Sequence, residues 1–358
     1  MLTILIPMSG DNNFVGDEYD FPKPLIDIQG YPMIEWVIKN FESIVDKKFI
    51  FIVNESDCRN YHLDSVLKLL AGEDSVIIKV DQSTQGAACT ALLAIEHIDI
   101  ETPLLISNSD HVIDWNLQDI YQDFSKRQLD GGVVCFPSVH PKWSYARVEN
   151  MQIIETAEKR PISRNAIAGT YYFSQGSFFV NAAMKMIEKQ AHVNQLYYIA
   201  PTLNELILEG KLLGTFDIPE SKYHHFYEPN KIHEFERQFK EQQTLTNNYL
   251  EQTKEYIKSF NDKNLDKISH MLNDNFVLED PVVNRIQGKS SVLNAIKKIF
   301  ENCNKLSFSA KNIFIDGDFS IIEFELRIDN TLLKGIDVIE WSGQEMKELK
   351  AYFDTPKG

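Results

Sequence analysis

Short apolar runs alternate with helical patterns along the first part of the chain. Four runs have the length and β-branched content of buried parallel strands: residues 2–7, 48–53, 75–80 and 103–107. Three stretches have the apolar spacing of helices: residues 32–43, 62–71 and 86–97. This alternation predicts an α/β domain with a doubly wound, mostly parallel sheet. Ligands bind such sheets at the carboxyl ends of the strands, so we expect the functional residues in the loops there.

The order of elements changes after residue 261. Residues 233–260 are polar and helix-forming, and we expect a linker helix that continues into the first helix of a new domain. Further helical patterns are followed by four strand-like stretches: residues 305–315, 319–328, 331–341 and 346–353. Helices followed by a run of strands indicate an α+β domain. We therefore predict two domains, 1–240 and 248–358.

Length and composition agree with a two-domain soluble protein. The 358 residues exceed what one core usually serves, and the 43% hydrophobic and 25% charged shares are ordinary. A net charge of −16 repels nucleic acid and anionic membranes, so we expect neither as a partner. Four scattered cysteines, no signal peptide and no apolar span of membrane length favour the cytoplasm.

Two loops carry the residues best suited to phosphate chemistry. After the first strand, Ser9 and Gly10 let the backbone approach phosphate oxygens, and Lys23 can neutralise charge on them. After the 103–107 strand, Asp110 can hold a Mg²⁺ ion that bridges substrate phosphates. The alternatives are a surface lysine between two prolines and an aspartate that caps a turn.

Three further segments offer substrate contacts. Gln82, Gln85 and Gly86 precede a helix of small residues and could face a nucleotide base. The polar–aromatic segment HPKWSYARV, with Tyr145, suits a sugar ring. In AEKRPIS, Glu158 could accept hydrogen bonds from hydroxyls, and Lys159 could bind a phosphate. Taken singly, each segment is more often surface or core, so their order along the chain matters most.

That order resembles the sugar-phosphate nucleotidyltransferases, a family with a GT-A-like domain that includes glucose-1-phosphate thymidylyl-, cytidylyl- and uridylyltransferases. The matching segments run in family order over more than 200 residues: IPMSG, FPKPLIDIQGYPMIEWVI, TQGAACTALLA, LLISNSDHV, AEKRPIS, AGTYYF and YYIAPTLNELILEG. The most specific of them is PKPL followed by G-x-P-M-I-E.

The resemblance implies roles for individual residues. Lys23 would contact the triphosphate and stabilise the transition state, and Asp110 would hold the catalytic Mg²⁺ or Mn²⁺. The nucleotide would lie against Pro7, Met8, Ser9, Gly10, Gln82 and Gly86. The residues that would bind the sugar phosphate, in addition to Tyr145, are Glu158, Lys159, Gly169, Gln195, Tyr198 and Asn204. A nucleoside triphosphate and a sugar phosphate or similar phosphate ester are thus the expected partners, with CTP as the expected nucleotide.

The sequence departs from the family in two places. The family loop G-x-G-x-R has an arginine that helps pyrophosphate leave, whereas residues 9–20 read SGDNNFVGDEYD and have none. The family's second metal ligand is an aspartate, whereas the matching stretch here reads HHFYEPN and places His225 near that position. A histidine can bind Mn²⁺ or a softer metal, but a plain surface histidine is an equal alternative.

Residues 248–358 resemble the SnoaL-like or nuclear-transport-factor-like cone domains. The resemblance is carried by YIKSFNDKNLDKISHMLNDNFVLEDPV, IQGKSSVLNAIKKIF and GIDVIEWSG. It implies a fold, and a possible homodimer, more than a function. Asp280 and Asp354 are candidate acids, because carboxylates beside an apolar pocket can have raised pKa values and transfer protons. The alternative is that both are rim residues of a non-catalytic domain.

The leading hypothesis is a metal-dependent nucleotidyltransferase that supplies an activated sugar for surface polysaccharide synthesis. A second is a bifunctional enzyme whose C-terminal domain isomerises the substrate or product. A third is a nucleotide-sugar binding protein without turnover, which the missing arginine favours. A fourth is a glycosyltransferase, against which Lys23 in PKPL argues, because that lysine serves a triphosphate.

Overall fold

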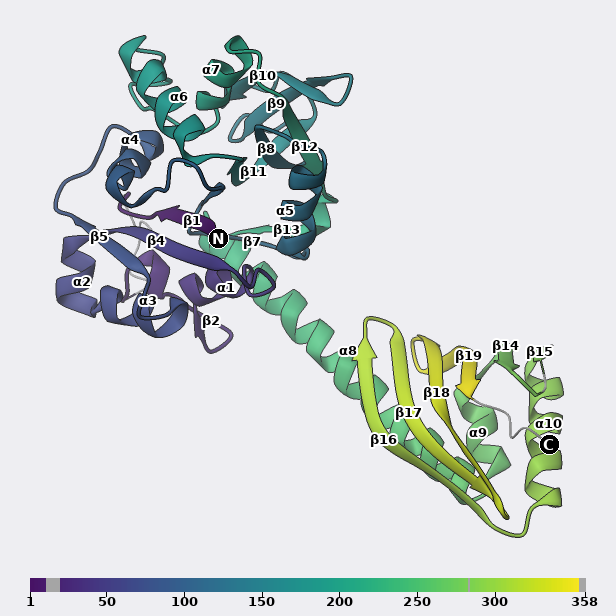
Figure 1. Cartoon of the computed structure of the whole chain (residues 1–358). Coiled ribbons are helices and arrows are strands. Elements are labelled where there is room, and N and C mark those ends of the chain that lie inside the picture. The colour runs from purple at the N-terminus through teal and green to yellow at the C-terminus, as the bar shows by residue number, and fades with distance from the viewer. Residues whose placement is uncertain (11–19, 283, 354–358) are drawn as a thin grey trace. The chain divides into compact units, whose positions relative to one another are not determined.

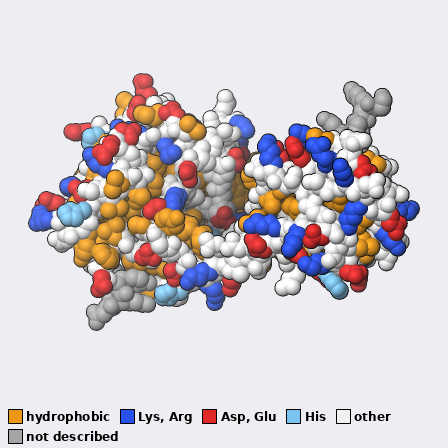
Figure 2. Space-filling model, turned by 90° about the horizontal axis from the view of Figure 1, so that it is seen from below, with side chains coloured by type: hydrophobic (Ala, Val, Ile, Leu, Met, Phe, Trp, Pro, Cys, Tyr) orange, Lys and Arg blue, Asp and Glu red, His pale blue; other side chains and the backbone are white. Residues whose placement is uncertain are grey.

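The computed structural model describes residues 1–10, 20–282 and 284–353, which form two compact units, Met1–Glu236 and Arg237–Gly358. Acidic and basic side chains are interspersed over the face drawn in Figure 2. None of the helices in the described ranges is long and apolar enough to cross a membrane. The domain boundary predicted at 240–248 lies within one long helix, α8 (Pro229–Asn261).

The N-terminal unit is built on a nine-stranded mixed sheet (Figure 1). Its parallel part has the order β6-β1-β4-β5. These strands are the four predicted apolar runs, now bounded as β1 (Leu2–Pro7), β4 (Lys47–Asn54), β5 (Val76–Val80) and β6 (Leu104–Ser107). The α/β class predicted from the sequence is therefore confirmed.

The rest of this sheet is largely antiparallel and begins at β11 (Asn165–Phe173), which pairs with β6. The other members are β8 (Gly131–Pro137), β9 (Ser144–Glu149), β10 (Gln152–Glu158) and β12 (Leu213–Asp217). Two small ribbons complete the strands of the unit: β2 (Asp27–Ile28) with β3 (Tyr31–Pro32), and β7 (His111–Ile113) with β13 (Tyr223–His225). The predicted mostly parallel sheet is thus mixed in direction.

Helices cover both faces of the sheet, because successive side chains of its central strand point to opposite sides. In β1, Ile4 and Ile6 join one hydrophobic cluster, whereas Leu5 joins another. The helices are α1 (Met33–Lys39), α2 (Glu55–Tyr61), α3 (Leu63–Ala71), α4 (Ala87–Leu92), α5 (Leu117–Lys126), α6 (Gly176–Glu188) and α7 (Thr202–Leu208), with short 3₁₀ turns η1 (Lys23–Leu25), η2 (Ile95–His97) and η3 (Glu220–Lys222). The helix predicted over 86–97 is therefore split into α4 and η2.

The C-terminal unit has a six-stranded sheet in the order β15-β14-β19-β18-β17-β16. Its strands are β14 (Leu272–Asp280), β15 (Asn284–Gln287), β16 (Leu306–Asp316), β17 (Phe319–Ile328), β18 (Thr331–Ser342) and β19 (Glu345–Phe353). Helices α9 (Leu265–Met271), α10 (Lys289–Asn302) and the end of α8 share one hydrophobic cluster with this sheet. The α+β class and the four predicted strands, β16 to β19, are confirmed, whereas β14 and β15 stand between α9 and α10 and were not predicted.

Helix α8 contributes side chains to the core of each unit. Ile232 and Phe235 pack in a cluster with residues of the N-terminal unit. Tyr249 and Tyr256 pack in the cluster of the C-terminal unit. Between these anchor points, no side chain in the range 236–248 is buried. The helix therefore has an apolar stripe at each end and an exposed middle.

Candidate active site

A cavity of about 240 Å³ opens at the carboxyl ends of β1 and β6. Five separate stretches of the N-terminal unit line it: Pro7, Met8, Gly10, Lys23, Pro24, Ala87, Asn108, Ser109, Asp110 and Tyr227. The first loop and the loop after β6 meet there because β1 and β6 are parallel neighbours. The cavity therefore stands where an open α/β sheet binds its ligand.

Lys23 and Asp110 meet in this cavity as an ion pair between Nζ and Oδ2. Lys23 lies on η1, and Asp110 stands between β6 and β7. Their side chains are 15% and 16% exposed, so the pair is largely shielded but can be reached from the cavity. Pairing of the two opposite charges offsets part of the cost of burying each of them.

Tyr227 and Asn108 complete the wall beside this pair. The Nδ2 of Asn108 donates a hydrogen bond to the Tyr227 hydroxyl at 3.0 Å. The Nζ of Lys23 lies 5.2 Å from the centroid of the Tyr227 ring, within the range of a cation–π interaction. Sequence reasoning singled out neither residue. The available signal was the position of Asn108 in the same loop as Asp110.

Gly169 shapes the cavity from β11 by leaving room for Asn108. Its φ of +69° is a conformation that side-chain-bearing residues rarely adopt, and a Cβ there would lie 2.5 Å from Nδ2 of Asn108. The backbone N–H of Asn108 also donates a hydrogen bond to the carbonyl oxygen of Gly169 at 3.0 Å. The absence of a side chain at Gly169 therefore allows the cavity-lining loop to approach β11 closely.

The residues expected at the nucleotide divide into two groups. Pro7, Met8 and Gly10 line the cavity, and Ser9 is buried beside them with an Oγ that has no hydrogen-bond partner among the described residues. Gln82 is exposed and lies outside the cavity lining, as does Gly86. The arginine-free loop falls largely in residues 11–19, outside the described residues.

Gly86 has a packing role at the start of α4. Its φ is +108°, and an added Cβ would lie 2.5 Å from the carbonyl oxygen of Tyr197. Backbone hydrogen bonds join the same two segments, from Tyr197 to Gln85 at 2.8 Å and from Ala88 to Tyr197 at 3.0 Å. The glycine therefore permits the close approach of the 195–198 segment to α4.

Glu158 and Lys159, the two residues expected at the acceptor site, stand at the end of β10 and directly after it. Glu158 is buried, and the hydroxyl of Ser144 donates a hydrogen bond to its Oε2. Burial raises the pKa of Glu158, although the Ser144 hydrogen bond and the charge of Lys159 oppose that rise. Lys159 donates a hydrogen bond from Nζ to the Tyr198 hydroxyl at 2.9 Å. A carboxylate and an ammonium group are thus held side by side.

Two other residues expected at the sugar phosphate, Gln195 and Asn204, have different surroundings. Gln195 is exposed in a turn with a φ of +64°. The side-chain amide of Asn204 binds the backbone of Thr156, accepting from its N–H at 2.8 Å and donating to its carbonyl at 2.9 Å. Asn204 therefore fastens α7 to β10.

The expected sugar contact by Tyr145 is wrong. Its side chain is 0% exposed, and its hydroxyl donates to the carbonyl of His140 at 2.7 Å. Strand β9 pairs with both β10 and β11, which encloses the ring in the core. The part of the polar–aromatic segment that contains Tyr145 is therefore an internal strand of the sheet.

His225 belongs to a backbone segment that is hydrogen-bonded to the segment of Asp110. It pairs with His111 between β13 and β7, and the next residue, Phe226, donates its N–H to the Asp110 carbonyl at 2.8 Å. The imidazole of His225 packs against the rings of Trp143 and Tyr227, each at 5.0 Å between centroids. Burial, chiefly, lowers the pKa of His225 to about 4, so its ring is neutral at pH 7.

The cavity has the donor chemistry of a magnesium site. Mg²⁺ prefers oxygen ligands and is commonly held by one or two carboxylates together with substrate phosphates. Asp110 supplies a carboxylate, and Asn108 and Ser109 add oxygen atoms to the same lining. The described residues contain no group of three or more His, Cys, Asp or Glu side chains placed to hold a metal. A metal at this site would thus depend on the substrate for several ligands.

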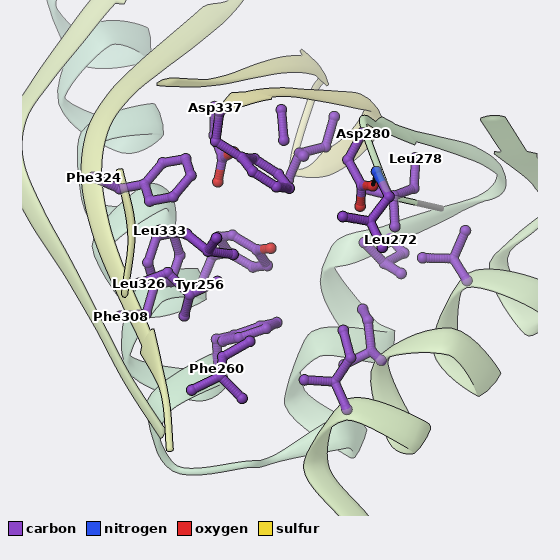
Figure 3. A pocket seen from close by; sticks show the side chains of 18 of the residues that line it. Tyr256, Phe260, Leu272, Leu278, Asp280, Phe308, Phe324, Leu326, Leu333 and Asp337 are labelled. Carbon is purple, nitrogen blue, oxygen red and sulfur yellow. Dashed lines mark hydrogen bonds between the residues drawn. The ribbon is translucent and has the colours of Figure 1, made fainter. Parts of the chain in front are cut away.

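A second cavity, of about 330 Å³, lies in the C-terminal unit (Figure 3). Asp280, which was expected at such a pocket, lines it. Asp354 lies outside the described residues. Asp337 on β18 lines the cavity too, and sequence reasoning missed it. The signal was its alternation with Ile339 and Trp341, which are buried on the same face of the strand.

A sequence model of the nucleotidyl transferase family matches residues 19–216, more than half of the chain. The chain belongs to this family. A SnoaL-like domain model matches residues 253–347, so this nucleotidyl transferase is fused to a SnoaL-like domain, as the sequence resemblance indicated.

Two solved structures resemble the nucleotidyl transferase unit. A nucleoside-diphosphate-sugar pyrophosphorylase from Vibrio cholerae RC9 is 26% identical, with a TM-score of 0.57, over 65% of this chain and 99% of that one. The inositol-1-phosphate CTP transferase from T. maritima is 13% identical, with a TM-score of 0.52, over 64% of this chain and 90% of that one. The second likeness shows the fold alone.

A curated relative matches a similar stretch. The bifunctional protein GlmU of Methanococcus aeolicus is 23% identical over 198 residues, which cover 54% of this chain. The chain spans only 44% of the length of that relative. The match therefore concerns the nucleotidyl transferase unit.

Proposed function

We propose that the protein transfers a nucleoside monophosphate from a nucleoside triphosphate to a sugar phosphate or similar small phosphate ester and releases pyrophosphate. The observation that carries this proposal is the meeting of Lys23 and Asp110 in one cavity at the carboxyl ends of β1 and β6. In a protein with a net charge of −16, this is a place where a cation and a metal-binding carboxylate can act on one triphosphate.

The reaction is a direct displacement. An oxygen of the acceptor phosphate forms a bond to the α-phosphorus, and the bond from that phosphorus to the bridging oxygen breaks. Pyrophosphate leaves with the electron pair. Lys23 turns from Asp110 to the triphosphate and stabilises the negative charge that moves onto the leaving oxygen. Asp110 would hold Mg²⁺ or Mn²⁺, which when bound offsets phosphate charge.

The acceptor is placed by the second group of residues. Ionised Glu158 accepts hydrogen bonds from sugar hydroxyls, and Lys159 binds the acceptor phosphate. Ser144 fixes one oxygen of Glu158. Tyr198 fixes Lys159. The two side chains thus reach the substrate from fixed positions, which lowers the entropy cost of orientation.

The test is pyrophosphate release from the full chain with Mg²⁺, each of the four nucleoside triphosphates, and a panel of sugar 1-phosphates and other phosphate esters. CTP is the first nucleotide to test. We propose that the product is used in the synthesis of a surface polysaccharide. Release from at least one pair, dependent on both substrates and on the divalent ion, is expected. Saturable binding of a nucleotide sugar without release from any pair would instead support the binding-protein hypothesis.

A further inference from the structure

The cavity of the C-terminal unit is lined almost entirely by apolar side chains. Its volume of about 330 Å³ is in the range of about 300–1,000 Å³ typical of small-molecule sites. Aromatic rings from five elements line it, including Phe260 on α8, Phe308 on β16 and Phe324 on β17. Figure 3 shows these side chains around one space between the sheet and the helices.

Three polar side chains interrupt this lining, and two of them are acids. Tyr256, Asp280 and Asp337 are the polar members among the described lining residues, and none of those residues is a lysine, arginine or histidine. In Figure 3 the carboxyl groups of Asp337 and Asp280 both face the cavity. One oxygen of Asp280 accepts a hydrogen bond from the Val282 amide at 2.7 Å.

Asp337 is the unusual member of this set. It is only 6% exposed, and its carboxyl group has no hydrogen-bond or ion-pair partner within the described part of the chain. Burial and, secondly, the charge of Asp280 raise the pKa of Asp337 to about 8. A buried acid without a partner costs stability, and a ligand that supplies the missing partner recovers that cost.

The chemistry of the lining discriminates among ligands. Phosphates and carboxylates are repelled by the acid pair, so the substrates proposed for the N-terminal cavity do not fit here. A plain hydrocarbon leaves Asp337 unsatisfied. A protonated amine offers several N–H donors to the two carboxyl groups, and the aromatic faces attract its charge. We propose that the cavity of the C-terminal unit binds a small apolar molecule that carries one protonated amine.

This proposal fixes the sign of a pH dependence. The titratable groups facing Asp337 are Asp280 from β14 and Tyr256 from α8, whereas the described lining from α10, β16, β17 and β19 is apolar. The amine binds ionised Asp337, so binding below the pKa of about 8 releases a proton and tightens as pH rises. A neutral ligand that accepts a hydrogen bond from protonated Asp337 would bind more weakly as pH rises.

Calorimetric titration of the full chain tests the proposal with three probes of one shape: benzylamine, benzyl alcohol and benzoate. Benzylamine is expected to bind at least about 10-fold more tightly than benzyl alcohol, a difference of about 1.4 kcal/mol, and benzoate not at all. Its affinity should rise between about pH 6.5 and pH 8.5, with proton release visible as a buffer-dependent heat. Asp337→Asn should weaken benzylamine at least about 10-fold, whereas Asp316→Asn, an exposed acid on β16, should not.

Four results would overturn the proposal. They are equal binding of the alcohol, affinity that falls with pH, unchanged affinity in Asp337→Asn, and no saturable binding of benzylamine to the unaltered protein. The pH series on the unaltered protein needs no substitution, so the proposal remains testable even if Asp337→Asn fails to fold. The outcome is also independent of pyrophosphate release, because the proposal does not rest on the activity of the N-terminal unit.

Discussion

Lys23 and Asp110, which are 87 positions apart in sequence, form an ion pair in the cavity at the end of β1. The pair forms because η1 and the loop after β6 reach the same end of two parallel strands. Each residue offsets the charge of the other in this pair. In the proposed reaction both residues would change partners, Lys23 to the triphosphate and Asp110 to the metal ion.

Lys23→Met and Asp110→Asn are each expected to lower the rate of pyrophosphate release at least about 100-fold, the usual scale for losing a charge-stabilising group. The matched controls are Lys222→Met and Asp114→Asn, which break a more exposed ion pair of 2.6 Å. An exposed pair contributes about 0–1 kcal/mol, so the controls should retain near-normal rates. Near-normal release by either cavity variant would contradict its assigned role.

Gly169→Ala is expected to lower both stability and turnover. The left-handed backbone costs an alanine roughly 1–2 kcal/mol, and its Cβ would displace Asn108. Gly210→Ala is a close control, because Gly210 has a φ of +73° but no atom within 4 Å of an added Cβ. Urea denaturation should show a loss in both variants, whereas pyrophosphate release should fall only in Gly169→Ala. Equal turnover in the two variants would show that the position of Asn108 does not affect the reaction.

Glu158→Gln is expected to stabilise the protein while weakening acceptor binding. Because burial raises the pKa of Glu158 above 4.5, folding disfavours its charged form. The resulting penalty is absent below the unfolded pKa and grows as pH rises through the folded pKa. The variant should therefore be the more stable protein at pH 7, but equal to the unaltered protein near pH 4.

The same substitution tests the acceptor role of Glu158. A hydrogen bond to a charged group contributes about 1.5–3 kcal/mol, so the KM for the sugar phosphate should rise at least about 10-fold at pH 7. Glu155→Gln on the same strand is the control, because Glu155 pairs with Arg147 and Arg160 at the surface. An unchanged KM in Glu158→Gln would place the acceptor elsewhere.

A chain that ends at residue 245 is expected to fold and to keep pyrophosphate release within about threefold of the full chain. It retains Ile232 and Phe235, which pack in the cluster of the N-terminal unit, and loses none of the cavity-lining residues at β1 and β6. Circular dichroism and the pyrophosphate assay measure the two outcomes. Loss of activity in a folded truncated protein would show that the C-terminal unit takes part in the reaction.

The sequence predicted the elements that depend on local pattern. β17 has the bounds expected from its alternation, and the parallel strands of the N-terminal unit follow their apolar runs. Lys23 and Asp110 could be paired in advance because parallel strands end at one edge of a sheet. Asn108 and Tyr227, joined by a hydrogen bond across 119 positions, could not be paired, because no local pattern encodes that contact.

Burial was the hardest property to predict where polar groups belong to the core. Tyr145 has a polar tip that suggested a substrate contact, yet pairing of β9 on both sides encloses it. Asp337 is the opposite case, because an acidic side chain is usually expected at the surface and this one is buried. Its place in the alternation with Ile339 and Trp341 was a readable sign that it faces inward. Both cases turn on which face of a strand a residue occupies.

The exposed middle of α8 has a consequence for how the protein unfolds. Residues 236–248 bury no side chain, and isolated helices shorter than about 12–15 residues are marginal in water. Their helical state is therefore maintained by the flanking turns that Phe235 and Tyr249 anchor. When heat melts one unit, fraying should travel along this segment and stop at the other anchor. The chain should then lose its two cores in separate steps, with no single melting temperature.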